Sequence, residues 1–241
     1  MTQALHIISS MATKQLLVDL IGLYQQTQRQ TQAQTSPGVQ PQEIQLESVG
    51  GVDAAKRVQA GEAFDIVALA SNTIEQLIAA GKVVAGSRVD VANSGVAVAV
   101  QAGAARPNIS TEAALKQAVL NAPTLGYSTG PSGVQLAKLF ERWGIAAQIH
   151  SRIVTAPPGV PVGSLVANGD VALGFQQLSE MVSQPGIDVL GPLPAEIQIT
   201  TTFSAGLAAT STQADAVRAL LAFFAAPATA DIKRRNGMEP A

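Results

Sequence analysis

Residues 5–24 have the sequence LHIISSMATKQLLVDLIGLY, and this stretch sets the fold class. Leu5-His6-Ile7-Ile8, which is apolar except for the histidine, predicts a short buried strand, and Ser9 and Ser10 follow it. The apolar residues that follow recur at helical spacing, namely Leu16, Leu17, Leu20, Leu23 and Tyr24. A buried strand that leads through a short polar loop into an amphipathic helix is the repeating unit of a parallel α/β sheet.

The same unit recurs along the chain. In the first half we expect strands at 44–48 and 65–70, and helices at 52–60 and 73–80. In the second half we expect strands at 125–127, 151–154, 171–174 and 188–190, helices at 112–120, 134–143 and 162–167, and a short helix near Leu178. Two further helices are expected at 213–225 and 228–235. The alternation predicts parallel strands with right-handed crossovers, whereas the Gln-rich stretch 25–42 predicts a frayed helix end and a solvent loop.

Two long extended segments, near 89–100 and 198–209, interrupt this alternation. We expect the chain to cross there between two lobes, with residues 1–88 and 203–241 in the first lobe and residues 89–202 in the second. The predicted fold class is therefore α/β, arranged as a two-lobed clamshell with two crossings that closes on a small ligand.

Composition narrows the classes of function. The 241 residues are 47% hydrophobic but only 4% aromatic and 13% charged, which favours an aliphatic interior between helices. The net charge of −2 and the absence of a basic stripe argue against nucleic-acid binding. The chain has no run of about 18 apolar residues, so we expect no insertion into a membrane. If Met1 stands in place of a removed signal peptide, we expect a periplasmic protein, and otherwise a cytoplasmic one.

Metal and cofactor chemistry find little support in the sequence. The chain has no cysteine and two separated histidines, so we expect neither a disulfide nor a metal site. It also lacks the glycine-rich fingerprints of dinucleotide and triphosphate sites, and the GxSxG elbow of hydrolases. We therefore expect a function without a cofactor.

Small segments rich in hydroxyls or glycine follow the predicted strands, where ligands bind in open α/β sheets. They are Ser9 to Thr13, Ser48 to Gly51, Ser71 to Thr73, Ser128 to Gly133 and, after Phe175, Gln176 and Gln177. Helix N-termini offer free backbone N–H groups to an anion, Ser and Thr add hydroxyl donors, and Gly lets the backbone come close. The alternative is that the hydroxyls only cap their helices. So many such segments at strand ends favour an anion site without a metal.

Two charged residues near these segments are candidates for chemistry. Glu47, at the end of the second strand, is either a general base or a solvated edge residue. Lys14 lies in the first turn of the first helix, where the helix dipole disfavours a cation. A bound carboxylate would explain a lysine at that position.

Several segments together resemble the type II solute-binding proteins, and most closely their molybdate-binding branch. The resemblance covers nearly the whole chain and rests on the order and spacing of Ile8 to Ser10, Asp65 to Ser71, Asn93 to Val98, Gly126 to Gly133, Val166 to Phe175 and Ala222 to Met238. It implies two lobes joined by a two-strand hinge, with an oxyanion bound between the lobes. It also implies ligand contacts from Ser9, Ser10, Ser48, Tyr127 and Ser128.

The chain departs from the molybdate binders in the second lobe. The last ligand loop there has Phe175-Gln176-Gln177-Leu178-Ser179 in place of a short aromatic and Asp-containing segment, and a Pro-rich loop at 157–163 precedes it. Amides and a rigid loop suit a planar carboxylated ligand better than a compact tetrahedral oxyanion. In this departure the chain is similar to the aconitate isomerases, a branch on the same scaffold that interconverts cis- and trans-aconitate.

Two functions follow. The first, which the altered loop favours, is an isomerase that moves an allylic proton of a tricarboxylate, with Ser10, Lys14, Glu47 and Tyr127 as candidates for the catalytic group. Substrate contacts are expected from a larger set of strand-end residues: Ser9, Ser10, Met11, Ser48, Val49, Gly50, Ser71, Ser128, Thr129, Ser132, Val160 and Gln176. The alternative is a receptor that delivers a small carboxylate or oxyanion to the permease of an ABC transporter, without catalysis.

Overall fold

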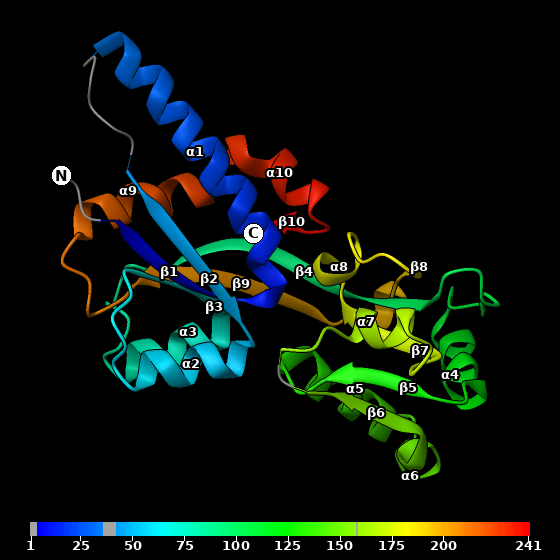
Figure 1. Ribbon diagram of the computed structural model, residues 1–241. Coiled ribbons are helices and arrows are strands. Elements are labelled where there is room, and N and C mark those ends of the chain that lie inside the picture. Colours follow the sequence, from blue (N-terminus) through cyan, green and yellow to red (C-terminus); the bar gives the residue numbers. More distant parts are fainter. Residues whose placement is uncertain (1–3, 36–41, 158) are drawn as a thin grey trace. The chain divides into compact units, whose positions relative to one another are not determined.

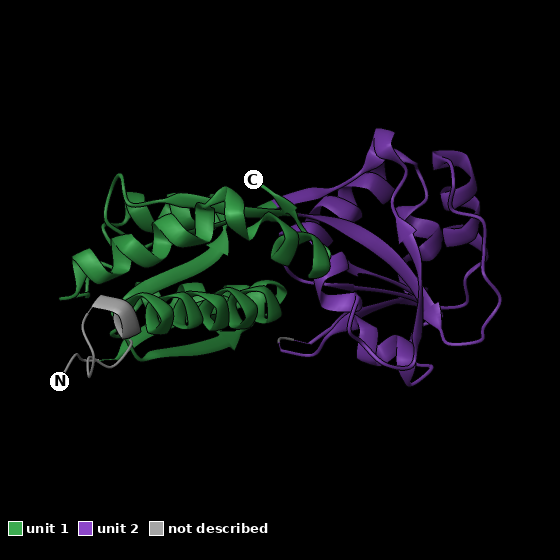
Figure 2. Cartoon of the chain, turned by 90° about the horizontal axis from the view of Figure 1, so that it is seen from above, with its two compact units in different colours: residues 1–93, 202–241 green, residues 94–201 purple. Residues whose placement is uncertain are grey.

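A computed structural model of the chain describes residues 4–35, 42–157 and 159–241. The chain divides into two compact units, which Figure 2 shows in different colours. Unit 1 consists of residues 1–93 and 202–241, and unit 2 of residues 94–201. The chain passes from unit 1 to unit 2 within strand β4 (Val89–Gln101) and returns within strand β9 (Thr200–Leu207).

Three parallel strands form the centre of unit 1. Strand β1 (Leu5–Ser10) pairs in parallel with β2 (Ile44–Val49) on one side and with β3 (Ile66–Ala70) on the other, and β9 is antiparallel to β3. Each of the three strands is followed by helical structure. The 3-10 turn η1 (Met11–Thr13) and α1 (Lys14–Thr35) follow β1, α2 (Gly51–Gln59) follows β2, and α3 (Ser71–Ala79) follows β3. The chain closes with α9 (Ala214–Ala225), η4 (Pro227–Thr229), α10 (Ala230–Arg235) and β10 (Glu239–Pro240), which pairs with β4.

Helices cover both faces of the unit 1 sheet, as Figure 1 shows. Leu5 and Ile7 point to one face, where they pack in a core with residues of α1 and α9. Ile8 points to the other face and packs with residues of α2 and α3. Strands buried on both faces need apolar side chains at successive positions, which is why β3 is an uninterrupted apolar run, whereas β1 keeps this pattern except at His6, which is exposed.

Unit 2 repeats this plan. Strand β5 (Leu125–Ser128) pairs in parallel with β6 (Ile153–Ala156) and β7 (Leu173–Gln177), while β4 is antiparallel to β7 and to β8 (Ile187–Pro192). One face packs against α4 (Glu112–Asn121) and α5 (Pro131–Arg142), and the other against α7 (Val162–Ala167) and α8 (Leu178–Met181). Shorter elements are α6 (Ala146–Ile149), η2 (His150–Arg152) and η3 (Ala195–Ile197).

Two sequence-based predictions need correction. The frayed end and loop expected from residue 25 onward are wrong as far as Thr35, because α1 continues to that residue, whereas residues 36–41 lie outside the described residues. Glutamine is a good helix former, and the Thr27 hydroxyl is satisfied by the Leu23 carbonyl at 2.9 Å. The strand expected at 171–174 begins at Leu173 and runs to Gln177, so both glutamines lie within β7 and are buried.

The backbone in the first turn of α5 lies very close to the backbone at the end of β5. Gly133 lies in the first turn of α5, and a Cβ atom at this position would lie 1.7 Å from the Ser128 carbonyl oxygen. No side chain fits there without moving the helix start. Glycine at position 133 therefore sets where α5 begins relative to the strand end that carries Tyr127 and Ser128.

Gly133→Ala should lower the free energy of unfolding by about 1–3 kcal/mol, because the added methyl group forces helix and strand apart. The matched control is Gly22→Ala in α1, where an added Cβ meets nothing within 4 Å. That change should raise stability by about 0.5–1 kcal/mol through helix propensity. Urea denaturation followed by circular dichroism measures both variants, and a Gly133→Ala protein as stable as the wild type would contradict the close approach.

Candidate functional site

The strand ends of unit 1 bring together two of the predicted serines. Ser9 and Ser48 are directly opposite each other in the β1–β2 register, and their hydroxyl oxygens are 2.7 Å apart. Ser9 is fully buried. The Ser9 hydroxyl also donates to the Ser10 carbonyl oxygen at 3.3 Å, and in that arrangement the Ser48 hydroxyl donates to Ser9. A ligand would then gain an O–H donor from this pair by replacing one of the two acceptors.

Ser10 ends β1 and precedes the 3-10 turn that leads into α1. Its hydroxyl lies 3.4 Å from that of Thr13, and both residues are buried. The backbone at Gly51, the first residue of α2, comes close to Ser10, since a Cβ there would lie 3.6 Å from the Ser10 Cβ. The other predicted residues of this edge are partly buried at the same turns: Met11, Val49, Gly50 and Ser71.

The starts of these helices lack side-chain caps. The residues before η1, α2 and α3 are Ser10, Gly50 and Ala70, and none of them caps the first turn through a side-chain hydrogen bond with a backbone N–H. In unit 2 the same holds for Gly130, which precedes α5. The interpretation that strand-end hydroxyls merely cap helices therefore fails here. The first-turn N–H groups of α2, α3 and α5 remain available to an anion.

Glu47 has an ion-pair partner, Arg57, that bears on its expected role as general base. Arg57 holds its carboxylate with two hydrogen bonds, at 2.5 Å and 2.9 Å, and also binds Glu62. The Arg57 guanidinium holds the pKa of Glu47 below its ordinary value, so the carboxylate is a weak proton acceptor. The Glu47 side chain is exposed, on the opposite side of β2 from its neighbour Ser48. Of its two expected roles, the solvated edge residue fits.

Lys14 is the first residue of α1 and is exposed. It makes no hydrogen bond or ion pair with any described residue. A role of its ammonium group in binding an anion remains the prediction made from the sequence.

Four predicted residues of unit 2 gather at the junction of β5 and α5. Tyr127 packs its ring against Phe140 at 6.1 Å between centroids, and burial raises the pKa of its phenol above the ordinary value. Ser128 is partly buried, Thr129 is exposed, and Ser132 is buried in the first turn of α5. A phenol that is harder to ionise serves as a hydrogen-bond donor rather than as a base.

Gln176 lies at the end of β7 and is buried. Its Oε1 accepts a hydrogen bond of 3.1 Å from the backbone N–H of Gly163, in the first turn of α7. Val160, in the loop before α7, is exposed, and its N–H donates to the Pro157 carbonyl. The structure thus connects Gln176 with the start of α7, which the sequence did not predict.

Two more polar residues lie near Gln176: Gln177, which the sequence placed in the same segment, and Glu180, which the sequence reasoning missed. Gln177 is buried, and its Nε2 donates to the Thr201 hydroxyl at 2.8 Å, whereas its Oε1 has no hydrogen-bond partner among the described residues. Glu180, in α8, is partly exposed, and burial raises the pKa of its carboxyl from 4.5 to about 7, while a hydrogen bond from Gln176 lowers it. One feature of the sequence could have pointed to Glu180. Between residues 153 and 187 the only other charged side chain is that of Asp170.

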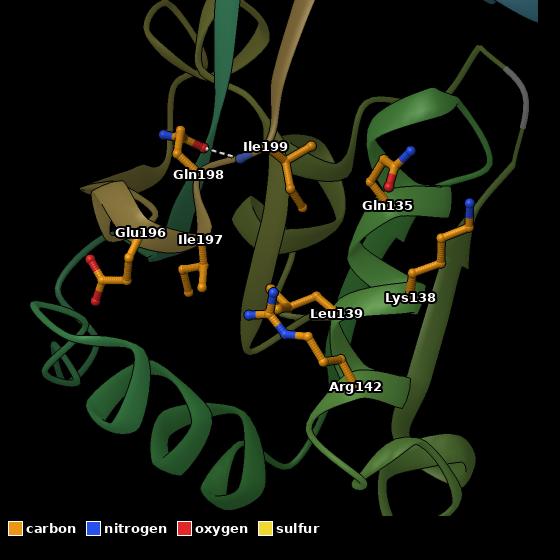
Figure 3. Close-up of a pocket in the computed structure, with 8 residues that line it drawn as sticks. All are labelled: Gln135, Lys138, Leu139, Arg142, Glu196, Ile197, Gln198 and Ile199. Atoms are coloured by element: carbon orange, nitrogen blue, oxygen red, sulfur yellow. Dashed lines mark hydrogen bonds between the residues drawn. The ribbon is translucent and has the colours of Figure 1, made fainter.

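A groove of about 290 Å³ lies on the surface of unit 2, between α5 and residues 196–199 (Figure 3). Its walls are Gln135, Lys138, Leu139, Arg142, Glu196, Ile197, Gln198 and Ile199. None of these residues belongs to the predicted site. The side chain of Gln198 is held there by its own backbone neighbour, since its Oε1 accepts from the Ile199 N–H at 2.8 Å.

The described part of the chain contains neither a metal-binding group of side chains nor a membrane-spanning helix. No group of three or more His, Cys, Asp or Glu side chains suited to a metal ion occurs in residues 4–35, 42–157 and 159–241. Within the same ranges, no helix combines the length and apolar character needed to cross a membrane.

Comparison with known proteins identifies a family. Residues 5–239 match the family described as bacterial extracellular solute-binding proteins. An aconitate isomerase from Pseudomonas sp is 37% identical to the chain over 185 residues, which are 76% of this chain and 70% of that protein. The resemblance to the solute-binding proteins, inferred above from short segments, is confirmed, and the similarity to aconitate isomerases, inferred from the altered second-lobe loop, agrees with this relative.

Solved structures share the fold. The periplasmic molybdate-binding protein of Azotobacter vinelandii superposes with a TM-score of 0.74 at 18% identity, covering 97% of this chain and 98% of that one. The sulfate-binding protein SubI from Mycobacterium tuberculosis H37Rv gives a TM-score of 0.72 at 15% identity, with 99% and 87% covered. These likenesses confirm the predicted α/β fold class.

Arg57→Gln should raise the pKa of Glu47 towards its ordinary value, because the guanidinium that stabilises the carboxylate is gone. Carboxyl ¹³C NMR during a pH titration measures this shift. The matched control is Lys56→Gln, which removes a neighbouring cation whose partner is Asp53. A titration of Glu47 that stays depressed in the Arg57 variant would show that another group holds the carboxylate.

Proposed function

We propose that this chain, which belongs to the bacterial extracellular solute-binding protein family, isomerises aconitate by moving an allylic proton. The observation that carries the proposal is the aconitate isomerase from Pseudomonas sp, which is 37% identical over 76% of this chain. Aconitate is a planar tricarboxylate, so its binding requires many donors to anionic oxygens. Its isomerisation also requires donors for the negative charge that spreads over the carbon skeleton and a carboxylate after the proton leaves.

The strand ends offer such donors. We assign the carboxylates of the substrate to the uncapped starts of α2, α3 and α5 and to the neighbouring hydroxyls. The substrate-binding residues of this proposal are Ser9, Ser10, Met11, Ser48, Val49, Gly50 and Ser71 in unit 1, with Ser128, Thr129, Ser132, Val160 and Gln176 in unit 2. Lys14 adds a cation that no described carboxylate neutralises.

The four residues first considered for catalysis fit other roles. Glu47 is held by Arg57 as a weakly basic carboxylate, and Tyr127 is a phenol whose pKa burial raises. Ser10 donates or accepts hydrogen bonds beside Thr13 without a base in its own contacts. We therefore assign Ser10, Lys14 and Tyr127 to substrate binding and charge stabilisation, and the proton-transfer step needs a different group.

The alternative function is a receptor for a small anion that serves an ABC transporter. It is supported by the family, whose members are described as extracellular solute-binding proteins, and by the molybdate- and sulfate-binding structures that share the fold. The receptor would use the same donors and no base. For either function we propose a location outside the cytoplasm, in keeping with the family.

Turnover separates the two functions. The absorbance of pure cis- or trans-aconitate, followed in the presence of micromolar protein, should move from either starting isomer to the same final spectrum. Mixing without protein, and with heat-denatured protein, controls for spontaneous isomerisation. If the protein binds aconitate tightly but the absorbance spectrum never changes, the isomerase function is wrong and the receptor function remains.

Ser10→Ala should weaken aconitate binding about 5- to 150-fold, which corresponds to the loss of about 1–3 kcal/mol for a buried hydroxyl donor. Isothermal titration calorimetry measures the dissociation constant. The matched control, Ser110→Ala, removes an exposed hydroxyl far from any strand end and should leave it unchanged. If Ser10→Ala leaves the dissociation constant unaltered, the end of β1 is not part of the binding site.

A further inference from the structure

Glu180 is an isolated carboxyl at the strand-end edge of unit 2. It lies in α8, three residues after the end of β7, at the edge where α5 and α7 also begin. Among the described residues Glu180 forms no ion pair, and its ionisation is affected by burial and by the Gln176 side chain. The carboxylates nearest in sequence have other positions: Asp170 is exposed before β7, and Asp188 on β8 accepts from the Gly103 N–H.

Gln176 orients this carboxyl, and the direction of its amide is fixed. The backbone N–H of Gly163 can only donate, so the atom of Gln176 that faces it at 3.1 Å must be the carbonyl oxygen. The amide NH₂ is therefore the end that meets Glu180 and donates to its carboxylate. One NH₂ donor occupies one carboxylate oxygen, and the second oxygen keeps its acceptor capacity.

The surroundings give Glu180 the proton affinity that a base needs. Burial raises the pKa of its carboxyl to about 7, and the Gln176 donor keeps it from rising further. A group with this pKa is charged in about half of the molecules at neutral pH and can both take and return a proton. Glu180 as a whole residue is partly exposed, although its carboxyl is largely buried.

We propose that Glu180 is the catalytic base of the isomerisation and that Gln176, anchored on Gly163, is its positioning residue. This inference rests on the proposed function. A carboxylate oxygen of Glu180 takes the proton from the methylene carbon of aconitate, and the C–H electron pair spreads over the allylic carbons and the adjacent carboxylate. The same carboxyl then returns a proton to the former vinylic carbon, so the double bond moves and no atom or electron is gained or lost.

Glu180→Gln removes the base and preserves the shape of the side chain. We expect its kcat for aconitate to fall at least about 100-fold, while the dissociation constant for aconitate changes less than about threefold. Glu180→Asp keeps a carboxyl on a shorter side chain and should retain more activity than the glutamine variant. The matched control is Glu141→Gln, which neutralises an exposed glutamate of α5 and should keep wild-type kcat.

The pH dependence of stability shows whether the glutamine variant is folded and whether the carboxyl is buried as described. The folded-state pKa of Glu180 lies above its ordinary 4.5, so the folded protein binds the extra proton and loses stability as pH rises from about 4.5 to about 7. Glu180→Gln lacks this loss, and its free energy of unfolding should therefore depend less on pH across that window. Urea denaturation at pH 4.5 and pH 7.5 measures the difference.

The outcomes distinguish the two proposals. A wild-type protein that turns over aconitate, with a Glu180→Gln variant of equal kcat, overturns the assignment of the base and leaves the isomerase function standing. A wild-type protein that binds aconitate without turnover overturns the function, and the assignment of a base falls with it. Loss of kcat with retained binding in Glu180→Gln, together with wild-type activity in Glu141→Gln, supports both.

Discussion

The parallel pairing of β1 with β2 and β3, and of β5 with β6 and β7, is the constraint on which the rest of the structure depends. Parallel strands end at one edge of a sheet, and each must be followed by a helix that packs on a face, so helix N-termini gather at that edge. Strands β3 and β7 are buried throughout and carry no charged side chain, whereas β2, at the side of the sheet, exposes Glu47. The anion-binding capacity of each edge therefore comes from backbone N–H groups and small hydroxyls rather than from a cluster of cations.

The scarcity of cations at the strand ends affects the pKa of a carboxyl at the edge of unit 2. A carboxyl placed among neutral, partly buried groups has no cation to favour its charged form, and its pKa rises. Glu47 and Glu180 show the contrast within one chain: Arg57 lowers the pKa of the first, whereas burial raises the pKa of the second, which has only an amide donor, to about 7. The same residue type thus serves stability in one place and is suited to proton transfer in the other.

The sequence predicted much of this architecture because apolar runs followed by helical spacing leave few alternatives. Residues 5–24 indicated the strand, the turn and the first helix, and the Ser9 and Ser48 side chains do meet at the strand ends. The sequence could not place Gln176 inside β7, because a buried glutamine in a strand is satisfied only by a distant backbone donor, here Gly163. It also gave Glu47 undue weight, since the pairing with Arg57 depends on how α2 packs beside β2. Glu180 was missed for the same reason: its pKa depends on burial and on one amide, neither of which is a local pattern.

The central claim is that the chain moves a proton between the allylic carbons of aconitate. Proton NMR of trans-aconitate in D₂O with the wild-type protein tests this most directly. The account predicts that cis-aconitate signals appear and that the methylene signal loses intensity as solvent deuterium enters during turnover. A spectrum in which the bound trans isomer keeps its full methylene intensity, and no cis isomer forms, would contradict it.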